Sequence, residues 1–135
     1  MKKLLLMLLL VGLVPVAAAH HSAAALYALD QDLEIEGVVT EFRFVNPHLR
    51  IYLDVTTDSG DVVEWMAEGG TPIVLTRLGW SSHEIKPGVH LRVSGNPARD
   101  GSNLVHLVTI TLPDGTELFG EDVDFQAVDR RRRQE

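Results

Sequence analysis

The chain has 135 residues, a hydrophobic fraction of 45% and a net charge of −7, which suits one globular domain. A chain this acidic is repelled by phosphate backbones, so we expect no nucleic-acid partner. The absence of cysteine excludes disulfides, thiolate metal sites, a cysteine nucleophile and a lipidated cysteine at a mature N-terminus.

Residues 1–19 have the three parts of a secretory signal peptide. Lys2 and Lys3 give the positive start, Leu4–Val14 the apolar middle, and Ala17–Ala19 the small residues for cleavage. The apolar run is shorter than the ~20 residues that a membrane-spanning helix needs, so we expect cleavage rather than anchoring. No second apolar run follows, and we therefore expect a mature protein without a transmembrane segment, exported to a bacterial periplasm.

Cleavage after Ala19 would make His20 the new N-terminus, with His21 beside it. A terminal histidine offers a free amine and a ring nitrogen, and further imidazoles complete the in-plane nitrogen set that copper(II) favours. The alternative is a solvated terminus that happens to hold two histidines, since chain ends are usually poorly ordered. Residues 20–32 are predicted to form an arm, in part as a short helical turn.

Alternating apolar residues predict a series of strands after this arm. In the first strand, Leu33–Val45, the apolar phase shifts after Gly37 to Val38, Phe42 and Phe44, which predicts a bend at the glycine. The strands expected next are His48–Thr57, Val62–Glu68, Val89–Gly95 and Asn103–Leu112, followed by a short segment, Thr116–Phe119.

A short helix is predicted between the third and fourth strands. Thr71 is expected to cap it, Pro72 to stand at its first position, and the helix to run over Ile73–Leu78. Three strands, a helix and two strands is the order of a mainly β, five-stranded OB-like Greek-key barrel. An open five-stranded sandwich with one helix is the alternative.

The predicted β domain spans residues 33–119. Residues 120–135 are acidic and then basic through Arg130–Arg133, which predicts a mobile tail. Contact of this arginine run with a membrane surface or a partner is the alternative.

A polar corner at Asn46-Pro47-His48 lies between the first two strands. Asparagine before proline favours a turn, and His48 takes the opposite phase to the core residues of the next strand. The sharpest hypothesis is a copper(II) site made by His20, His21 and His48, with Glu68 as a further ligand or as a group that holds a ring in place. The alternatives are that His48 caps backbone carbonyls and that Glu68 lies on a solvated strand face.

A second hypothesis is a metal-free site for a small ligand or an envelope protein. Its candidate residues are Asn46, Arg50, Tyr52 and Trp65, which supply a polar corner, a cation and two aromatic rings. For Trp65, a place in the core is the alternative.

Enzyme motifs are absent from the sequence. The serines lack a nucleophile-elbow context, no glycine motif cradles phosphate, and Glu64 and Glu68 would lie roughly 13 Å apart on one strand. The chain resembles histidine-brace copper oxygenases only in its expected terminal histidine, so a small copper oxidase is the third hypothesis. We expect a non-catalytic binding protein.

Short segments, taken together in their order along the chain, carry a resemblance to a known family. They are His20-His21-Ser22, Asn46-Pro47-His48, Trp65 with Glu68-Gly69-Gly70, Leu78-Gly79-Trp80, Lys86-Pro87-Gly88, Pro97-Ala98-Arg99, Asp100–Asn103 and Thr111–Gly115. The chain resembles a set of small exported bacterial proteins classified as a domain of unknown function, family 6152. The resemblance implies export and one small domain, and it implies no activity, substrate or cofactor.

Overall fold

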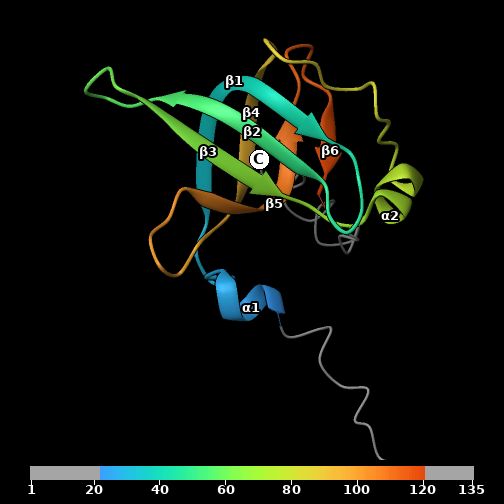
Figure 1. The fold of residues 1–135 in the computed structure, drawn as a ribbon, viewed down its shortest axis with the longest axis horizontal. Coiled ribbons are helices and arrows are strands. Elements are labelled where there is room, and N and C mark those ends of the chain that lie inside the picture. Colours follow the sequence, from blue (N-terminus) through green and yellow to red (C-terminus); the bar gives the residue numbers. More distant parts are fainter. Residues whose placement is uncertain (1–21, 121–135) are drawn as a thin grey trace, which may run out of the picture.

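A computed structural model describes residues 22–120 of the chain (Figure 1). Within this range none of the helices has the length and the apolar character needed to cross a membrane. The predicted signal peptide, His20, His21 and the Arg130–Arg133 run lie outside the described residues. The elements in chain order are α1 (Ser22–Leu26), β1 (Leu33–Arg43), β2 (Arg50–Thr56), β3 (Val62–Glu68), α2 (Pro72–Arg77), β4 (His90–Pro97), β5 (Leu104–Thr111) and β6 (Glu117–Phe119).

The first five strands form a closed barrel. β1 pairs antiparallel with both β2 and β4, while β2 pairs with β3 and β4 with β5. A parallel pairing of Met66–Glu68 with Leu104–His106 joins β3 to β5 and closes the barrel, and β6 adds a short antiparallel strand to β5. The predicted mainly β, five-stranded OB-like barrel with a short helix between strands 3 and 4 is therefore confirmed, and the open sandwich is excluded.

The bend of β1 lies three residues later than the sequence pattern predicted. The register places Val39 opposite Leu53 and Glu41 opposite Tyr52, so Thr40 is an extra residue in a bulge. Ile35 and Val39 are buried before it, while Val38, which the predicted phase shift placed inside, is exposed.

Gly37 has a different role from the predicted bend. A Cβ atom there would lie 2.6 Å from the backbone oxygen of Asp54. The residue next to it, Val38, pairs with both His90 on β4 and Asp54 on β2. Glycine therefore permits the close approach of backbones where β1 passes from one neighbour to the other.

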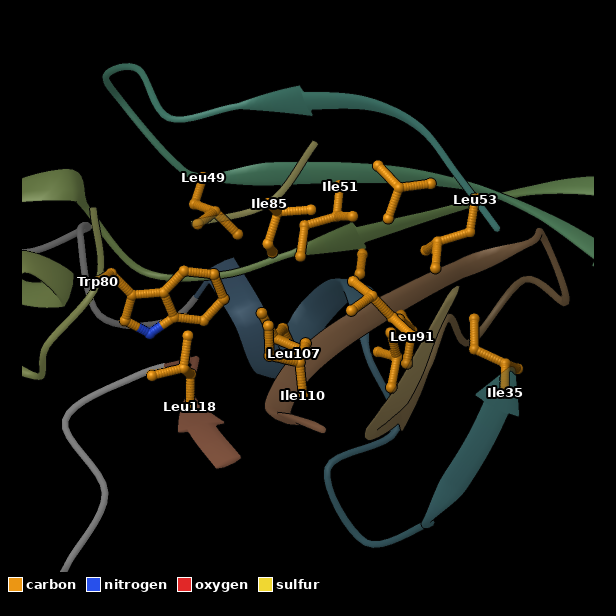
Figure 2. Close-up of a cluster of buried hydrophobic side chains, with 14 of the residues drawn as sticks. Ile35, Leu49, Ile51, Leu53, Trp80, Ile85, Leu91, Leu107, Ile110 and Leu118 are labelled. Atoms are coloured by element: carbon orange, nitrogen blue, oxygen red, sulfur yellow. The ribbon is translucent and has the colours of Figure 1, made fainter. Parts of the chain in front are cut away.

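The barrel encloses one apolar core (Figure 2). Its fully buried side chains include Leu49, Ile51, Leu53, Leu91, Val93, Val105, Leu107 and Ile110. Trp80 closes one end, where its indole Nε1 donates a hydrogen bond to the backbone oxygen of Phe119 at 2.8 Å and its ring stacks near Phe42. The same contacts fix the chain after α2 against β6, so the loops at this end rest on a rigid base.

Candidate functional site

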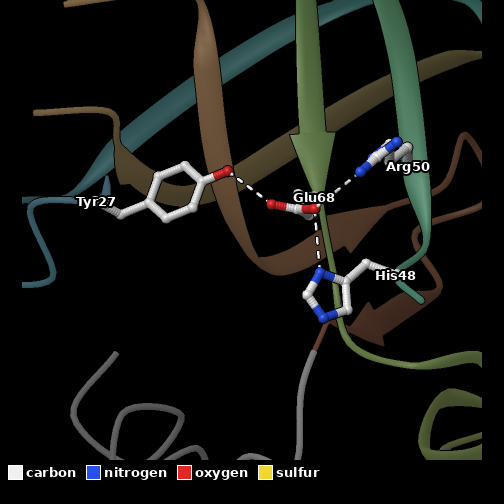
Figure 3. A network of polar contacts seen from close by, with 4 residues as sticks. All are labelled: Tyr27, His48, Arg50 and Glu68. Carbon is white, nitrogen blue, oxygen red and sulfur yellow. Dashed lines mark hydrogen bonds and ion pairs between the residues drawn. The ribbon is translucent and has the colours of Figure 1, made fainter. Parts of the chain in front are cut away.

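Glu68, the last residue of β3, is the centre of a polar cluster at the edge of the barrel (Figure 3). We call Tyr27, His48, Arg50 and Glu68 the Glu68 cluster. The backbone of Glu68 is paired with Arg50 on β2 and with His106 on β5. Because strands hold it on both sides, the direction of its side chain is set by the closure of the barrel.

Three side chains share the Glu68 carboxylate. The Tyr27 hydroxyl donates a hydrogen bond to Oε2 at 3.0 Å. Nδ1 of His48 lies 3.1 Å from Oε1, and the Arg50 guanidinium lies 3.6 Å from the same oxygen. The Glu68 side chain is only 17% exposed, whereas the His48 side chain is 44% exposed. The cluster therefore has a shielded acid and an imidazole that reaches solvent.

The charge state of Glu68 follows from these contacts. Burial raises its pKa, but hydrogen bonds from His48 and Tyr27 and the positive charge of Arg50 together leave the pKa below its ordinary value. The pKa of Tyr27 is raised, mainly because its hydroxyl is buried and also because the negative charge of Glu68 lies beside it. At neutral pH the cluster therefore contains a carboxylate that accepts and a neutral phenol that donates.

This carboxylate selects the tautomer of His48. An ionised carboxylate can only accept hydrogen bonds, so the proton between the two groups belongs on Nδ1 of the ring. In the neutral imidazole the lone pair is then on Nε2. Figure 3 shows this second nitrogen turned away from Glu68, and it has no hydrogen-bond partner among residues 22–120.

Tyr27 was missed by the sequence analysis, although it is 3% exposed and belongs to the predicted arm. It forms a bridge with Ala98, and its ring centroid lies 5.2 Å from that of His106. A tyrosine in an alanine-rich arm is a weak signal by itself. Its partner Glu68 is 41 residues away in the sequence, and only the folded barrel brings the two together.

The structure brings together two of the four predicted metal ligands. His48 and Glu68 are in contact, while His20 and His21 lie outside the described residues. Within residues 22–120 no group of three or more histidine, aspartate or glutamate side chains is arranged to hold a metal ion. Both oxygens of Glu68 are already engaged, so its chemistry suits the orientation of the His48 ring better than direct coordination.

The structure brings two of the four predicted ligand-binding residues onto one face and separates the other two from them. Asn46 is exposed and precedes Pro47 through a cis peptide bond. Arg50 and Tyr52 share the outer face of β2, whereas Trp65 is partly buried and packs against the core. Arg50 and Tyr52 can thus act on one ligand, and Trp65 lies on the opposite face of the sheet.

A model of a family of unknown function, DUF6152, matches residues 8–106. No curated protein matches the chain. The matched range contains β1 to β4 and all four residues of the Glu68 cluster.

Proposed function

The chain belongs to DUF6152, a family of unknown function, and we propose that it is an exported, non-catalytic protein that binds copper(II) or another transition metal through His48 and its mature N-terminal histidines. One observation carries the proposal: the carboxylate of Glu68 lies 3.1 Å from Nδ1 of His48, on the ring edge opposite Nε2. Histidines that bind metals usually donate their other N–H to a carboxylate or a carbonyl, which orients the ring and raises its basicity.

The remaining ligands would come from His20 and His21. Tyr27 is hydrogen-bonded to the same carboxylate as His48, so the arm is attached beside the proposed site. The five residues between His21 and Tyr27 form α1, which rises only about 7.5 Å, so the predicted ligands precede a short helix that ends directly before Tyr27. The terminal amine, its imidazole and Nε2 of His48 would give copper(II) the nitrogen ligands it favours. The signal-peptide pattern of residues 1–19 supports both the free amine and export to the periplasm.

A titration of the mature chain with copper(II), followed by calorimetry and electron paramagnetic resonance, tests the proposal. We expect one tightly bound ion per chain and a spectrum typical of nitrogen ligands. One extra residue before His20, or His48→Gln, should weaken binding by tenfold or more, on the order of 1.4 kcal/mol. His83→Gln is the matched control, because His83 is an exposed loop residue. Equal affinity in the His48→Gln variant and the unmodified chain would contradict the proposal.

Glu68 is a positioning residue in this proposal, and it has its own test. Glu68→Gln removes the charge that holds the His48 tautomer and should weaken copper binding about 10–100-fold. It should also change the pH dependence of binding, which a loss of folding stability alone would not do. Glu64→Gln is the control on the same strand, since Glu64 is exposed and makes no hydrogen bond to the described residues. If the copper complex forms, oxygen consumption with a reductant separates metal storage from the oxidase hypothesis.

The metal-free alternative is also supported by one observation. Nε of Arg50 is buried and has no hydrogen-bond partner among the described residues, and Arg50 shares the outer face of β2 with Tyr52. This pair would suit an anionic small ligand or an acidic segment of an envelope protein. Equally weak copper binding with and without the extra N-terminal residue would favour this alternative. Thermal stabilisation of chelator-treated protein by small anions, lost in Arg50→Gln, would then identify the site.

A further inference from the structure

The first half of β3 has a free backbone edge within the described residues. Met66, Ala67 and Glu68 pair with β5, whereas Val62 to Trp65 pair only with β2. The N–H of Met66 donates to the backbone oxygen of Asn103, which shows which edge faces β5. Glu64 and Val62 lie two and four residues earlier, so their backbone groups point to the same edge, beyond the start of β5. Figure 1 shows this part of the β2–β3 ribbon extending past the barrel.

The turn of this ribbon is strongly acidic. Between residues 54 and 64 the chain carries Asp54, Asp58, Asp61 and Glu64 and neither lysine nor arginine, and all four acids are exposed. Val62 beside them is 63% exposed. An unpaired edge with an exposed apolar residue readily accepts another strand, and the charges favour a basic one.

We propose that residues 121–135 of this chain add to the free edge of β3 as an extended segment antiparallel to the strand, with Arg130–Arg133 beside the acidic turn. The sequence of this segment fits such a contact, because Val123, Phe125 and Ala127 alternate with polar residues as strand residues do. The four arginines supply the charge that the turn lacks. The segment also carries Glu121, Asp122, Asp124, Asp129 and Glu135, and the first three of these acids lie toward Gly120, away from the acidic turn.

The distances along the chain agree with this arrangement. The backbone oxygen of Gly120 accepts a hydrogen bond from the N–H of Gly70 at 2.6 Å, so the described part of the chain ends close to the carboxyl end of β3. From Gly70 back to Val62 is eight residues, or about 26 Å of extended chain. β5 occupies this edge as far as Met66, so the segment would pass outside β5 before it reaches Trp65, and the ten residues from Gly120 to Arg130 span about 33 Å when extended. The arginines that follow would then reach Asp58 and Asp61.

Amide exchange on the full mature chain, treated with a chelator, tests this inference independently of metal binding. The amides of Val62 and Glu64 should exchange about tenfold more slowly than they do in a variant with Arg130–Arg133 changed to glutamine. Asp58→Asn with Asp61→Asn should give the same acceleration. The matched control, Asp100→Asn with Asp114→Asn, neutralises two acids in other turns and should leave exchange at β3 unchanged. Exchange at Val62 and Glu64 that is equally fast in every variant overturns the proposal.

A spin label identifies the occupant of the edge. Because the chain has no cysteine, Ala127→Cys gives a single site for a nitroxide. The label should broaden the amide signals of Val62 and Glu64 within the labelled chain, and raised salt should weaken the effect. Broadening only in unlabelled chains that are mixed with labelled ones would assign the edge to a second copy and overturn the proposal.

Discussion

The two halves of β3 differ in the number of strands that hold them. Met66–Glu68 lies between β2 and β5, and Glu68 at its end is surrounded by three hydrogen-bonding or charged partners. Val62 to Trp65 is paired on one edge only within residues 22–120, and it carries an exposed valine and an exposed glutamate. The closed half fixes the direction of the Glu68 side chain. The open half has backbone N–H and C=O groups that can pair with another segment.

The difference has a simple energetic origin. Ala67 in the closed half is fully buried opposite Ile51, so its neighbours are fixed by the packing of the core. The open half lies beyond the barrel, and within residues 22–120 no strand pairs with its second edge. Substitutions in the two halves should therefore differ in cost, and four experiments measure the difference.

The largest effect is expected from Ile51→Ala, which empties the core beneath the closed half. Ile51 is fully buried, and truncation of such a residue typically costs about 2–5 kcal/mol of unfolding free energy. Urea denaturation followed by tryptophan fluorescence measures the loss. A cost below about 1 kcal/mol would show that the closed half is not held by core packing.

Tyr27→Phe should have the next largest effect, because it removes the hydroxyl that joins the arm to Glu68. A hydrogen bond to a charged group contributes about 1.5–3 kcal/mol to stability. Tyr52→Phe is the matched control, since the Tyr52 hydroxyl makes no hydrogen bond to the described residues. Equal denaturation midpoints for the two variants would mean that the Tyr27–Glu68 contact does not stabilise the fold.

The pH dependence of stability should reveal Glu68. Its pKa is below the ordinary value in the folded chain, so the unfolded chain binds the proton more readily. The stabilisation is therefore complete above the ordinary pKa of glutamate and is lost as the pH falls through the lowered value. Glu68→Gln should flatten the fall of unfolding free energy between about pH 5 and pH 3. Glu64→Gln serves as the control, and an equally steep fall in both variants would contradict the assignment.

The smallest effect is expected from Val62→Ala in the open half. This valine is 63% exposed, and surface substitutions of this kind usually change stability by less than about 0.5 kcal/mol. The same denaturation experiment measures it. A loss as large as that of Ile51→Ala would show that the open half is covered by a tightly packed segment.

Much of the barrel could be predicted from the alternation of apolar residues. The predicted bounds of the third strand, Val62–Glu68, are those of β3, and the helix begins at Pro72, which was predicted as its first position. The bend of β1 was misplaced because glycine is only one way to bend a strand. The bulge instead inserts Thr40, an ordinary β-forming residue, and the partner strand decides where it occurs.

The candidate site could be predicted only in part. His48 and Glu68 were grouped from their chemistry, and they are in contact. Arg50 was predicted only as a ligand-binding residue, and its contact with Glu68 was not foreseen. Tyr27 could not be found, because a hydrogen bond across 41 residues leaves no pattern in the local sequence.

Local rules predict the positions of the strands, the turns and the short helix. Each of these elements depends on the spacing of apolar and turn-forming residues that lie only a few positions apart. His48 meets Glu68 through the pairing of β2 with β3, whereas the meeting of Tyr27 with Glu68 depends on the parallel pairing of β3 with β5, which closes the barrel. Such a pairing joins distant segments through backbone hydrogen bonds that any residue can make. The pairing therefore leaves almost no signal in the amino-acid sequence, and it is determined only by the packing of the folded core.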